Sequence, residues 1–420
     1  MSTSDFPRLT PPPVFSRALE LLEAMVSISS PSGDRSGLEA VTRLYGDRLA
    51  ELGLAVTIEP EGDDALPVLD ARSPAAGESG YLLAVGHIDT VLPAGPVKRT
   101  GRRLVATGSV DMKAGLVALA GALDLLRSAG RRGGEDLRVA VVPDEEIAGP
   151  LSHQVVRALG PGARGLWSLE PGRTISEAAG DGAPDDAPSE REDGETLVIG
   201  RRGMLWWGLD IHGRSAHAGT SFWQGRSAAG AAAAWWLGAE ALIGHGDGPT
   251  LNAGRMVVGE HGFVDDLAGS ADLLFSQRQL NVVPDRARLE GEARFLRAGE
   301  ADALRDALET LTHEIADQRG VRMELDVGGL VPPLDPAGPS HTWAERAAAH
   351  AARRGWRLVA EEDRRGISFP NFLKDPSTVP ILDGLGPVGG GMHTRAEWVD
   401  LPSLDRRIAL LADLLEEDAG

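Results

Sequence analysis

Residues 81–90 read YLLAVGHIDT, and this stretch decides the fold class of the chain. Its apolar part, residues 81–85, is continuous and too short for a helix. A run of this kind is typical of a strand in a parallel sheet that helices cover on both faces, because neither face of such a strand meets water. His87 and Asp89 follow directly. The stretch therefore predicts a buried strand that ends in polar side chains.

Two further apolar runs have the same character. Residues 137–142 (LRVAVV) and 166–169 (LWSL) are each too short for a helix, and acidic residues come after both. Between residues 81–85 and residues 137–142, residues 112–129 have the apolar spacing of a helix. The order strand, helix, strand predicts an open α/β sheet.

The pattern changes from about residue 196. Helical segments and short alternating segments follow one another there, which predicts two helices packed on a small antiparallel sheet. We therefore expect an α/β domain of residues 1–197 and 331–420, interrupted by an inserted α+β domain of residues 198–330. The expected elements of the insert are 204–211, 226–242, 255–258, 287–295, 301–318 and 321–327.

Composition and charge limit the class of partner. The formal net charge of the 420 residues is -20. An acidic surface repels phosphate backbones and anionic lipids, so we expect neither nucleic acid nor a membrane as partner. The chain has no cysteine, which excludes disulfides and thiolate metal ligands. No signal peptide or membrane span is visible, so we expect a cytoplasmic protein.

Two further features of the composition are the acidic segment 180–195 and the distribution of tryptophan. Residues 180–195 are rich in acidic residues, proline and glycine, which predicts a mobile surface loop. Tryptophans gather in the insert, where they indicate core packing or a dimer interface, with an aromatic substrate pocket as the less common alternative. These tryptophans are Trp206, Trp207, Trp223, Trp235 and Trp236.

Histidines and carboxylates stand at the ends of the expected strands or, in one case, at the start of a helix. Each alone has an ordinary explanation: an aspartate before a helix is usually a cap, and a run of acids is usually a solvated loop. In an open α/β sheet, however, the carboxyl ends of the strands share one edge, where ligands bind. Nitrogen and oxygen ligands suit zinc best, with cobalt or manganese possible. The candidate metal ligands are His87, Asp111, Glu146, Glu170 and His393.

These motifs, in this order, resemble the co-catalytic zinc peptidases that include glutamate carboxypeptidase, aminoacylase, succinyl-diaminopimelate desuccinylase and acetylornithine deacetylase. The resemblance runs from about Ala18 to Leu415 and is closest to the glutamate carboxypeptidase branch. It implies an open mixed sheet sandwiched by helices, with an inserted ferredoxin-like domain that acts as a lid and dimer contact. It also implies a zinc-dependent metallohydrolase with two zinc ions.

The resemblance implies a role for each residue of the site. His87 and Glu170 would hold one zinc ion, Glu146 and His393 would hold the other, and Asp111 would bridge the two. Two more residues complete the implied catalytic set: Glu145 would be the general base, and Asp89 would orient His87.

The insert carries two motifs that also resemble the family. Residues 213–219 (GRSAHAG) resemble a lid motif in which His217 would come from the partner subunit of a homodimer and help hold the oxyanion. Asn281 begins a segment whose later arginine, Arg294, would bind the substrate carboxylate, a task that suits the guanidinium fork. Without the resemblance, both would be ordinary surface or strand residues.

One segment departs from the family pattern. Residues 366–371 read GISFPN, and Phe369 stands where the family has an aspartate. Ser368 and Asn371 fit the pattern, and Ser368 is a candidate substrate-binding residue.

Three functions remain open on the sequence. The first is a carboxypeptidase or dipeptidase that releases a C-terminal amino acid from a small peptide or a folate-like conjugate. The second is a deacylase of N-acyl amino acids, which shares the same chemistry. The third is a metal-binding relative with little hydrolysis that acts as a binding protein. Phe369 is the feature that favours the third, whereas the complete ligand set and Glu145 argue against it.

Overall fold

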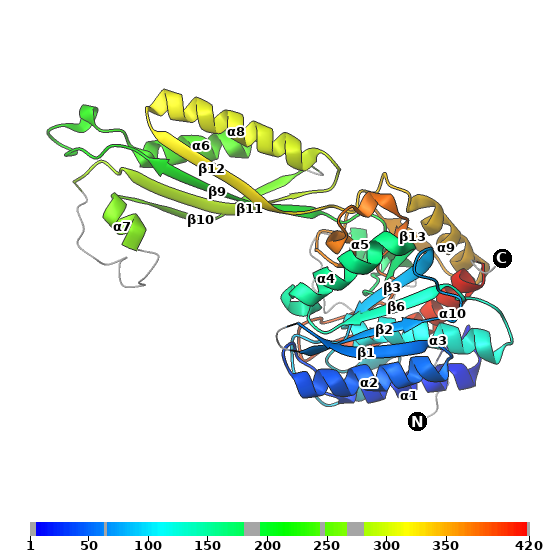
Figure 1. Cartoon of the computed structure of the whole chain (residues 1–420). Coiled ribbons are helices and arrows are strands. Elements are labelled where there is room, and N and C mark those ends of the chain that lie inside the picture. The colour runs from blue at the N-terminus through cyan, green and yellow to red at the C-terminus, as the bar shows by residue number, and fades with distance from the viewer. Residues whose placement is uncertain (1–5, 63–64, 180–193, 244–247, 267–280, 418–420) are drawn as a thin grey trace. The chain divides into compact units, whose positions relative to one another are not determined.

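The computed structural model describes residues 6–62, 65–179, 194–243, 248–266 and 281–417. The chain divides into two compact units, which are residues 1–201 with 334–420, and residues 202–333. Each unit has its own hydrophobic core. The sequence predicts an insert of residues 198–330, and the second compact unit spans residues 202–333. Figure 1 shows the elements of both units along the chain.

The first unit is built on a six-stranded mixed sheet. The first two pairings, β1–β2 and β2–β6, are antiparallel, and the pairings β6–β3, β3–β7 and β7–β14 are parallel. In spatial order, the strands are β1 (Ala55–Glu61), β2 (Leu66–Arg72), β6 (Leu137–Val142), β3 (Tyr81–His87), β7 (Ala163–Ser168) and β14 (Ile381–Leu382).

The central strands β3 and β6 explain why the sheet needs helices on both faces. Every residue of both strands is buried, although side chains alternate between the two faces. Helices therefore cover the sheet on either side, as the continuous apolar runs predicted. The helices of this unit are α1 (Pro12–Ser27), α2 (Arg35–Glu51), α3 (Ala114–Ser128), α4 (Pro150–Leu159), α5 (Ile175–Ala179), α9 (His341–Arg353) and α10 (Leu401–Glu417).

Two small sheets complete the first unit. One is the parallel pair β8 (Glu195–Val198) and β13 (Leu358–Glu361). The other is antiparallel and runs in the order β15 (Gly389–Gly390), β16 (Trp398–Asp400), β5 (Arg103–Val105) and β4 (Lys98–Thr100). This second sheet joins the segment after Gly389 to the segment before α3.

The second unit has the β-α-β-β-α-β order of a ferredoxin-like fold. Its sheet runs β10-β11-β9-β12, and all neighbouring strands are antiparallel. The two long helices pack on each other and on this sheet. The elements are β9 (Gly203–His212), α6 (Ala228–Leu242), β10 (Thr250–Gly259), α7 (His261–Asp266), β11 (Arg286–Phe295), α8 (Glu300–Arg319) and β12 (Arg322–Val331). The expected fold class, α/β with an α+β insert, is confirmed.

The tryptophans of the second unit divide between core and surface. Trp207 and Trp235 are fully buried, with ring centroids 5.1 Å apart, and Trp236 stacks on Trp207. Trp206 is partly exposed, and Trp223 is 88% exposed. Core packing therefore accounts for three of the five and leaves Trp206 and Trp223 without that explanation.

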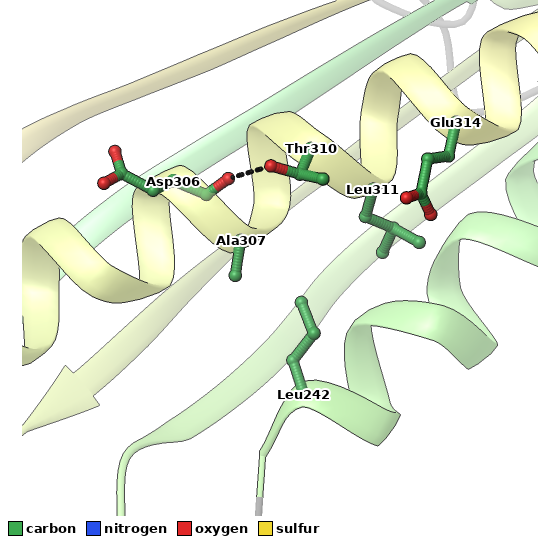
Figure 2. A pocket seen from close by; sticks show the side chains of 6 residues that line it. All are labelled: Leu242, Asp306, Ala307, Thr310, Leu311 and Glu314. Carbon is green, nitrogen blue, oxygen red and sulfur yellow. Dashed lines mark hydrogen bonds between the residues drawn. The ribbon is translucent and has the colours of Figure 1, made fainter.

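A shallow depression lies on the surface formed by α6 and α8. Its volume is about 380 Å³. The hydroxyl of Thr310 donates to the backbone carbonyl of Asp306 at 2.8 Å, so the helix itself satisfies this group (Figure 2). The depression holds none of the candidate catalytic residues, because its lining is Leu242, Asp306, Ala307, Thr310, Leu311 and Glu314.

The prediction of an acidic surface loop over residues 180–195 is wrong at its end. Residues 180–193 lie outside the described residues. Glu195, however, begins strand β8 and is only 2% exposed, because its carboxylate is held between two arginines. Arg406 donates to it at 2.7 Å and Arg407 at 2.8 Å. Composition alone did not reveal that this carboxylate has two arginines as partners.

Within the described part of the chain, no helix is long and apolar enough to cross a membrane.

Candidate metal centre

Three adjacent parallel strands deliver the first candidate ligands to one edge of the sheet. His87 is the last residue of β3. Glu146 lies in a short turn, Glu145–Ile147, soon after β6, and Glu170 comes two residues after β7. Because β6, β3 and β7 are neighbours and parallel, their carboxyl ends meet at the same edge. Asp111 precedes α3, and His393 follows β15.

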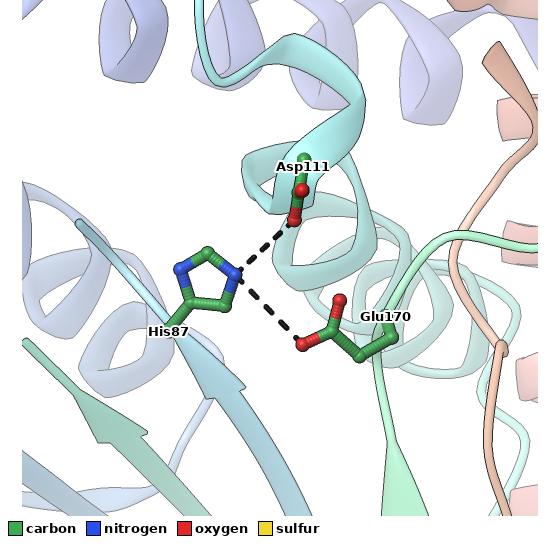
Figure 3. A group of neighbouring side chains, drawn as sticks. All are labelled: His87, Asp111 and Glu170. Atoms are coloured by element: carbon green, nitrogen blue, oxygen red, sulfur yellow. Dashed lines mark hydrogen bonds and ion pairs between the residues drawn. The ribbon is translucent and has the colours of Figure 1, made fainter. Parts of the chain in front are cut away.

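His87, Asp111 and Glu170 form a first group of potential ligands (Figure 3). The His87 Nε2 atom lies 3.2 Å from Asp111 Oδ1 and 3.8 Å from Glu170 Oε1. All three residues are buried. The imidazole nitrogen and two carboxylate oxygens converge on a common space, as ligands of one ion do.

Asp111, Glu146 and His393 form a second group. The His393 Nε2 atom lies 3.3 Å from Asp111 Oδ2 and 3.1 Å from Glu146 Oε2. Asp111 therefore turns one carboxylate oxygen toward His87 and the other toward His393. A carboxylate shared in this way is suited to bridge two cations. The His393 side chain is 56% exposed, so this group is open to solvent.

Asp89 connects His87 to the turn that carries the glutamates. Its Oδ1 atom lies 3.3 Å from His87 Nδ1, and its carboxylate accepts the backbone N–H groups of Glu145 and Glu146, both at 3.2 Å. The hydroxyl of Ser32 donates to it at 2.7 Å. Asp89 can therefore fix both the ring of His87 and the position of the two glutamates.

The three adjacent carboxylates of Asp144, Glu145 and Glu146 repel one another less because one of them points away from the other two. Asp144 turns away from the other two and caps helix α4, where it accepts the N–H groups of Leu151 and Ser152, both at 2.9 Å. Glu145 and Glu146 are left to face the site. The charge pattern alone does not distinguish the capping aspartate from its two neighbours, whereas the family resemblance gives roles to Glu145 and Glu146 only.

Burial and mutual charge set the protonation of the acidic groups. Burial raises the pKa of Glu145 to about 6 and that of Glu146 to about 8. Burial also raises the pKa of Glu170 well above its usual value, and repulsion from Glu145 adds to the rise. Carboxyl groups that hold protons at neutral pH must release them when a cation binds.

The two histidines are held in their charged forms by Asp111. Burial alone would lower the pKa of His87, but its interactions with Asp111 and Asp89 raise that pKa well above the usual value. The hydrogen bond to Asp111 raises the pKa of His393 to about 9. Burial acts to raise the pKa of Asp111 itself, yet hydrogen bonds from His393 and His87 hold it below its usual range.

The residues present fit a pair of divalent cations. Among the described residues, the buried Glu170 Oε1 atom has no hydrogen-bond partner. A buried carboxylate oxygen without a donor carries a desolvation cost that a cation would remove. The donor set of two imidazoles and three carboxylates also matches the preference of zinc, with cobalt and manganese as alternatives.

Sequence reasoning missed one residue beside the site. Glu397 is buried, and its carboxylate accepts three backbone N–H groups from the segment that carries Asp111. Burial raises the pKa of Glu397 to about 7.

Phe369 lies beside the first ligand group. Its ring centroid is 6.3 Å from that of His87 and 5.9 Å from that of Phe372, and Phe369 is fully buried. Ser368 is buried as well, and its backbone N–H donates to the side-chain oxygen of Asn371 at 3.1 Å. An apolar ring therefore packs next to His87 at the position where the family pattern has a carboxylate.

The other candidate substrate-binding residues belong to the second unit. His217 is exposed and lies in an antiparallel bridge with Val282. The backbone N–H of Ala218 donates to the Asn281 carbonyl at 2.8 Å, so the two motifs are adjacent. Arg294, on β11, is paired with Glu292 through hydrogen bonds of 3.0 and 3.1 Å.

Comparisons with known proteins agree with this geometry. Residues 83–417 match the Peptidase family M20/M25/M40. Carboxypeptidase G2 of Pseudomonas sp. (strain RS-16) is 26% identical over 94% of this chain and 88% of its own length. A succinyl-diaminopimelate desuccinylase of Methylorubrum populi is 27% identical over 95% of this chain and 97% of its own length.

The fold is shared with solved structures. A Bacillus subtilis protein described as a dinuclear metal-binding peptidase of family M20 superposes with a TM-score of 0.64 at 17% identity. The match covers 97% of this chain and 99% of that protein.

The chain belongs to the M20 family of peptidases, because the family match spans most of its length. It is an enzyme with metallohydrolase activity, of the peptidase and amidohydrolase class.

Proposed function

We propose that this enzyme uses two zinc ions to hydrolyse an amide bond and release a C-terminal amino acid from a small peptide or an N-acyl amino acid. The observation that carries the proposal is the divided carboxylate of Asp111, whose two oxygens face His87 and His393 separately. His87 and Glu170 would hold one ion, and Glu146 and His393 the other. Cobalt or manganese could replace zinc in this donor set.

Glu145 is the general base in this proposal. It belongs to neither ligand group, yet it follows directly on Asp144 beside Glu146. The two ions, when bound, polarise the scissile carbonyl and acidify the attacking water. Glu145 takes the proton of that water and passes it to the leaving amine. Asp89 keeps the His87 ring in the required orientation.

His217 supplies a donor for the oxyanion. Its Nδ1 atom accepts backbone N–H groups from Gly219 at 3.1 Å and from Thr220 at 3.2 Å. An Nδ1 atom that accepts two hydrogen bonds leaves the ring proton on Nε2 when the imidazole is neutral. The Nε2–H group can then donate to a developing oxyanion. The family resemblance assigns this role to a histidine of the partner subunit, so we also propose a homodimer through the inserted unit.

Substrate recognition would rest on Arg294, with Asn281 and Ser368 as further contacts. A guanidinium binds a carboxylate through two parallel hydrogen bonds, which favours substrates with a free C-terminal carboxylate. Carboxypeptidase G2 and succinyl-diaminopimelate desuccinylase, the relatives found, are named for substrates of this general chemistry.

A hydrolysis screen with zinc-loaded enzyme tests the proposal. The panel consists of dipeptides, N-acyl amino acids and folyl-type glutamate conjugates, and released amino acids are read by mass spectrometry. Release from one class identifies the enzyme as a peptidase or a deacylase. We expect Glu145→Gln to bind the same number of zinc ions as the wild type and to lose turnover by at least about 100-fold, the usual contribution of a general base.

Two outcomes would contradict parts of this account. Wild-type turnover in Glu145→Gln would show that another group is the base. No hydrolysis across the panel, with two ions bound per chain, would favour the alternative of a binding protein and direct attention to Phe369.

A further inference from the structure

The carboxylate of Glu397 is the point on which three backbone N–H groups converge. Its Oε2 atom accepts from Gly108 at 2.7 Å. Its Oε1 atom accepts from Val110 at 2.9 Å and from Asp111 at 3.0 Å. Glu397 is 3% exposed, so water cannot replace these bonds easily. A single buried side chain therefore accepts three backbone N–H groups of the turn that presents Asp111.

The backbone of Glu397 strengthens the same connection. Its carbonyl accepts the N–H group of Ala106 at 3.0 Å. The next residue, Trp398, pairs with Val105 where strands β16 and β5 lie together. The segment before Asp111 is therefore joined to the segment around Glu397 by both main-chain and side-chain bonds.

The turn that carries Asp111 has little freedom of its own. Gly108 has a φ of 72°, in the left-handed region, and a Cβ atom at this position would lie 2.5 Å from Thr90. The N–H groups of Val110 and Asp111 both point to one oxygen of Glu397. The direction of the Asp111 side chain thus depends on where the Glu397 carboxylate stands.

Glu397 also ends the loop that carries His393. His393 has a φ of 63°, which is uncommon for a residue other than glycine. Thr394 closes the loop: its N–H and its hydroxyl donate to the Gly391 carbonyl at 3.1 and 2.7 Å. The Glu397 N–H donates to the Thr394 carbonyl at 3.4 Å. Glu397 therefore links the loop of His393 to the turn of Asp111.

We propose that Glu397 is a positioning residue that holds the Asp111 carboxylate against His393, so that Asp111, Glu146 and His393 are arranged to bind the second ion. This inference rests on the proposed two-metal function. His87 and Glu170 stand at the ends of buried strands and do not depend on Glu397 for their places. Loss of Glu397 therefore weakens the ion at His393 more than the ion at His87.

Cobalt binding to the full-length protein tests this role. Co²⁺ is titrated into Glu397→Ala, Glu397→Gln and the wild type, and visible absorption reports the number of ions and the geometry of each site. We expect the first ion to bind Glu397→Ala nearly as it binds the wild type, and the second about 10–100-fold more weakly. Glu397→Gln keeps one acceptor oxygen for Val110 and Asp111, so its second site should be intermediate.

Asp405 provides a matched control. It is a buried carboxylate in α10 that likewise accepts backbone N–H groups, from Leu9 at 2.5 Å and Thr10 at 3.2 Å. Asp405→Ala should lower the midpoint of thermal unfolding and leave both cobalt sites and their spectrum unchanged. A change in the second site that is confined to the Glu397 variants supports positioning over a general loss of stability.

Two results separate the failure of this inference from the failure of the proposed function. Wild-type protein that binds fewer than two ions overturns the two-metal function. Two ions in the wild type, with the same affinities and cobalt spectrum in Glu397→Ala, overturn the positioning role alone. Should Glu397→Ala fail to fold, equal binding of both ions by Glu397→Gln and the wild type overturns it as well.

Discussion

Asp111 divides its two carboxylate oxygens between two histidines, and this arrangement sets the proton balance of the site. Hydrogen bonds from His393 and His87 hold the pKa of Asp111 low, whereas Asp111 raises the pKa of His393 to about 9. Burial raises the pKa of Glu146 to about 8. At neutral pH, Glu146 and His393 therefore hold protons at the position where a cation would bind.

Metal affinity should for this reason rise with pH. Glu146 and His393 hold protons below pH values of about 8 and 9, and a cation must displace those protons. As pH rises through these values the competition disappears. We expect the apparent zinc affinity to increase by about tenfold or more per pH unit between pH 6 and 8, with one or more protons released per ion.

Competition with a chromophoric chelator at several pH values measures this dependence. Proton release in unbuffered solution provides an independent count. An affinity that stays constant from pH 6 to 8, with no proton released, would mean that Glu146 and His393 are not ligands.

The ion pair of Arg294 with Glu292 leads to a prediction for the KM of variants at these two residues. A substrate carboxylate must compete with Glu292 for the guanidinium. We expect Glu292→Gln to lower KM for substrates with a free C-terminal carboxylate. Arg294→Ala should raise KM by about 10–100-fold, because charged hydrogen bonds contribute about 1.5–3 kcal/mol. Steady-state kinetics with free and C-terminally amidated substrates check both.

Arg288 is the matched control for Arg294. It lies on the same strand and donates to Glu290, also two residues away, at 2.9 Å. Arg288→Ala should leave KM unchanged, and the amidated substrate should respond to none of the three variants. An equal rise in KM for both substrates would remove Arg294 from carboxylate recognition.

The sequence predicted the candidate ligands because their residue types stand at strand ends or, for Asp111, at the start of a helix. The residue pattern alone could not predict the roles of the neighbouring carboxylates Asp144 and Glu397. Asp144 caps α4 while Glu146 meets His393, and the residue pattern by itself does not separate these two acids; the family resemblance and the course of the turn after β6 do. The bonds from Glu397 join residues 286 to 289 positions apart, a relation that no local pattern carries.

At the scale of elements, helix α3 closely approaches the segment that follows strand β7. A Cβ atom on Gly115 would lie 1.9 Å from the backbone carbonyl of Leu169, the residue before Glu170. A backbone atom cannot rotate away, so any side chain at 115 forces the helix and the segment of Glu170 apart. The first ligand group therefore depends on glycine at this position.

Gly115→Ala should destabilise the protein and the site together. We expect the free energy of unfolding to fall by about 1–3 kcal/mol, as is common for overpacked positions, and zinc affinity to fall with it. Chemical denaturation and zinc titration measure the two effects. Gly115→Ala with wild-type zinc affinity would contradict the dependence of Glu170 on this contact.

Gly121, on the same helix, gives the comparison. Its Cβ would meet Cδ1 and Cγ1 of the Ile408 side chain, both at 2.9 Å, and a side chain can shift where a backbone carbonyl cannot. Alanine is also the better helix former. Gly121→Ala should change stability little and leave zinc affinity as it is.

Sequence patterns predicted the central elements and missed the peripheral ones. The continuous apolar runs predicted β3 and β6, because strands buried on both faces leave no alternation. Strand β1 gave no such signal, since most of its residues are exposed. The end of the acidic segment was missed because Glu195 is neutralised by arginines more than 200 residues away.

At the scale of the whole molecule, the chain has two separate cores. One belongs to residues 1–201 and 334–420, and the other to residues 202–333. The chain leaves the first unit after Arg201 and re-enters it at Leu334. These two residues exchange backbone hydrogen bonds of 2.9 Å. Each unit can therefore unfold as a cooperative body.

Calorimetry should show two unfolding transitions. Removal of metal with a chelator should lower the midpoint of the first unit only, because the ligands all belong to it. Leu308→Ala, in the core of the second unit, should destabilise that unit by about 2–5 kcal/mol and leave the other transition unchanged. A single transition that responds to both changes would show that the units unfold together.

The central claim is that five residues hold two metal ions with Asp111 between them. Anomalous X-ray diffraction at the zinc edge, from crystals grown with zinc, tests it most directly. We predict two peaks about 3.5–4 Å apart, one beside His87 and Glu170 and one beside Glu146 and His393, with Asp111 in contact with both. One peak alone, or peaks away from these residues, would contradict the two-metal account.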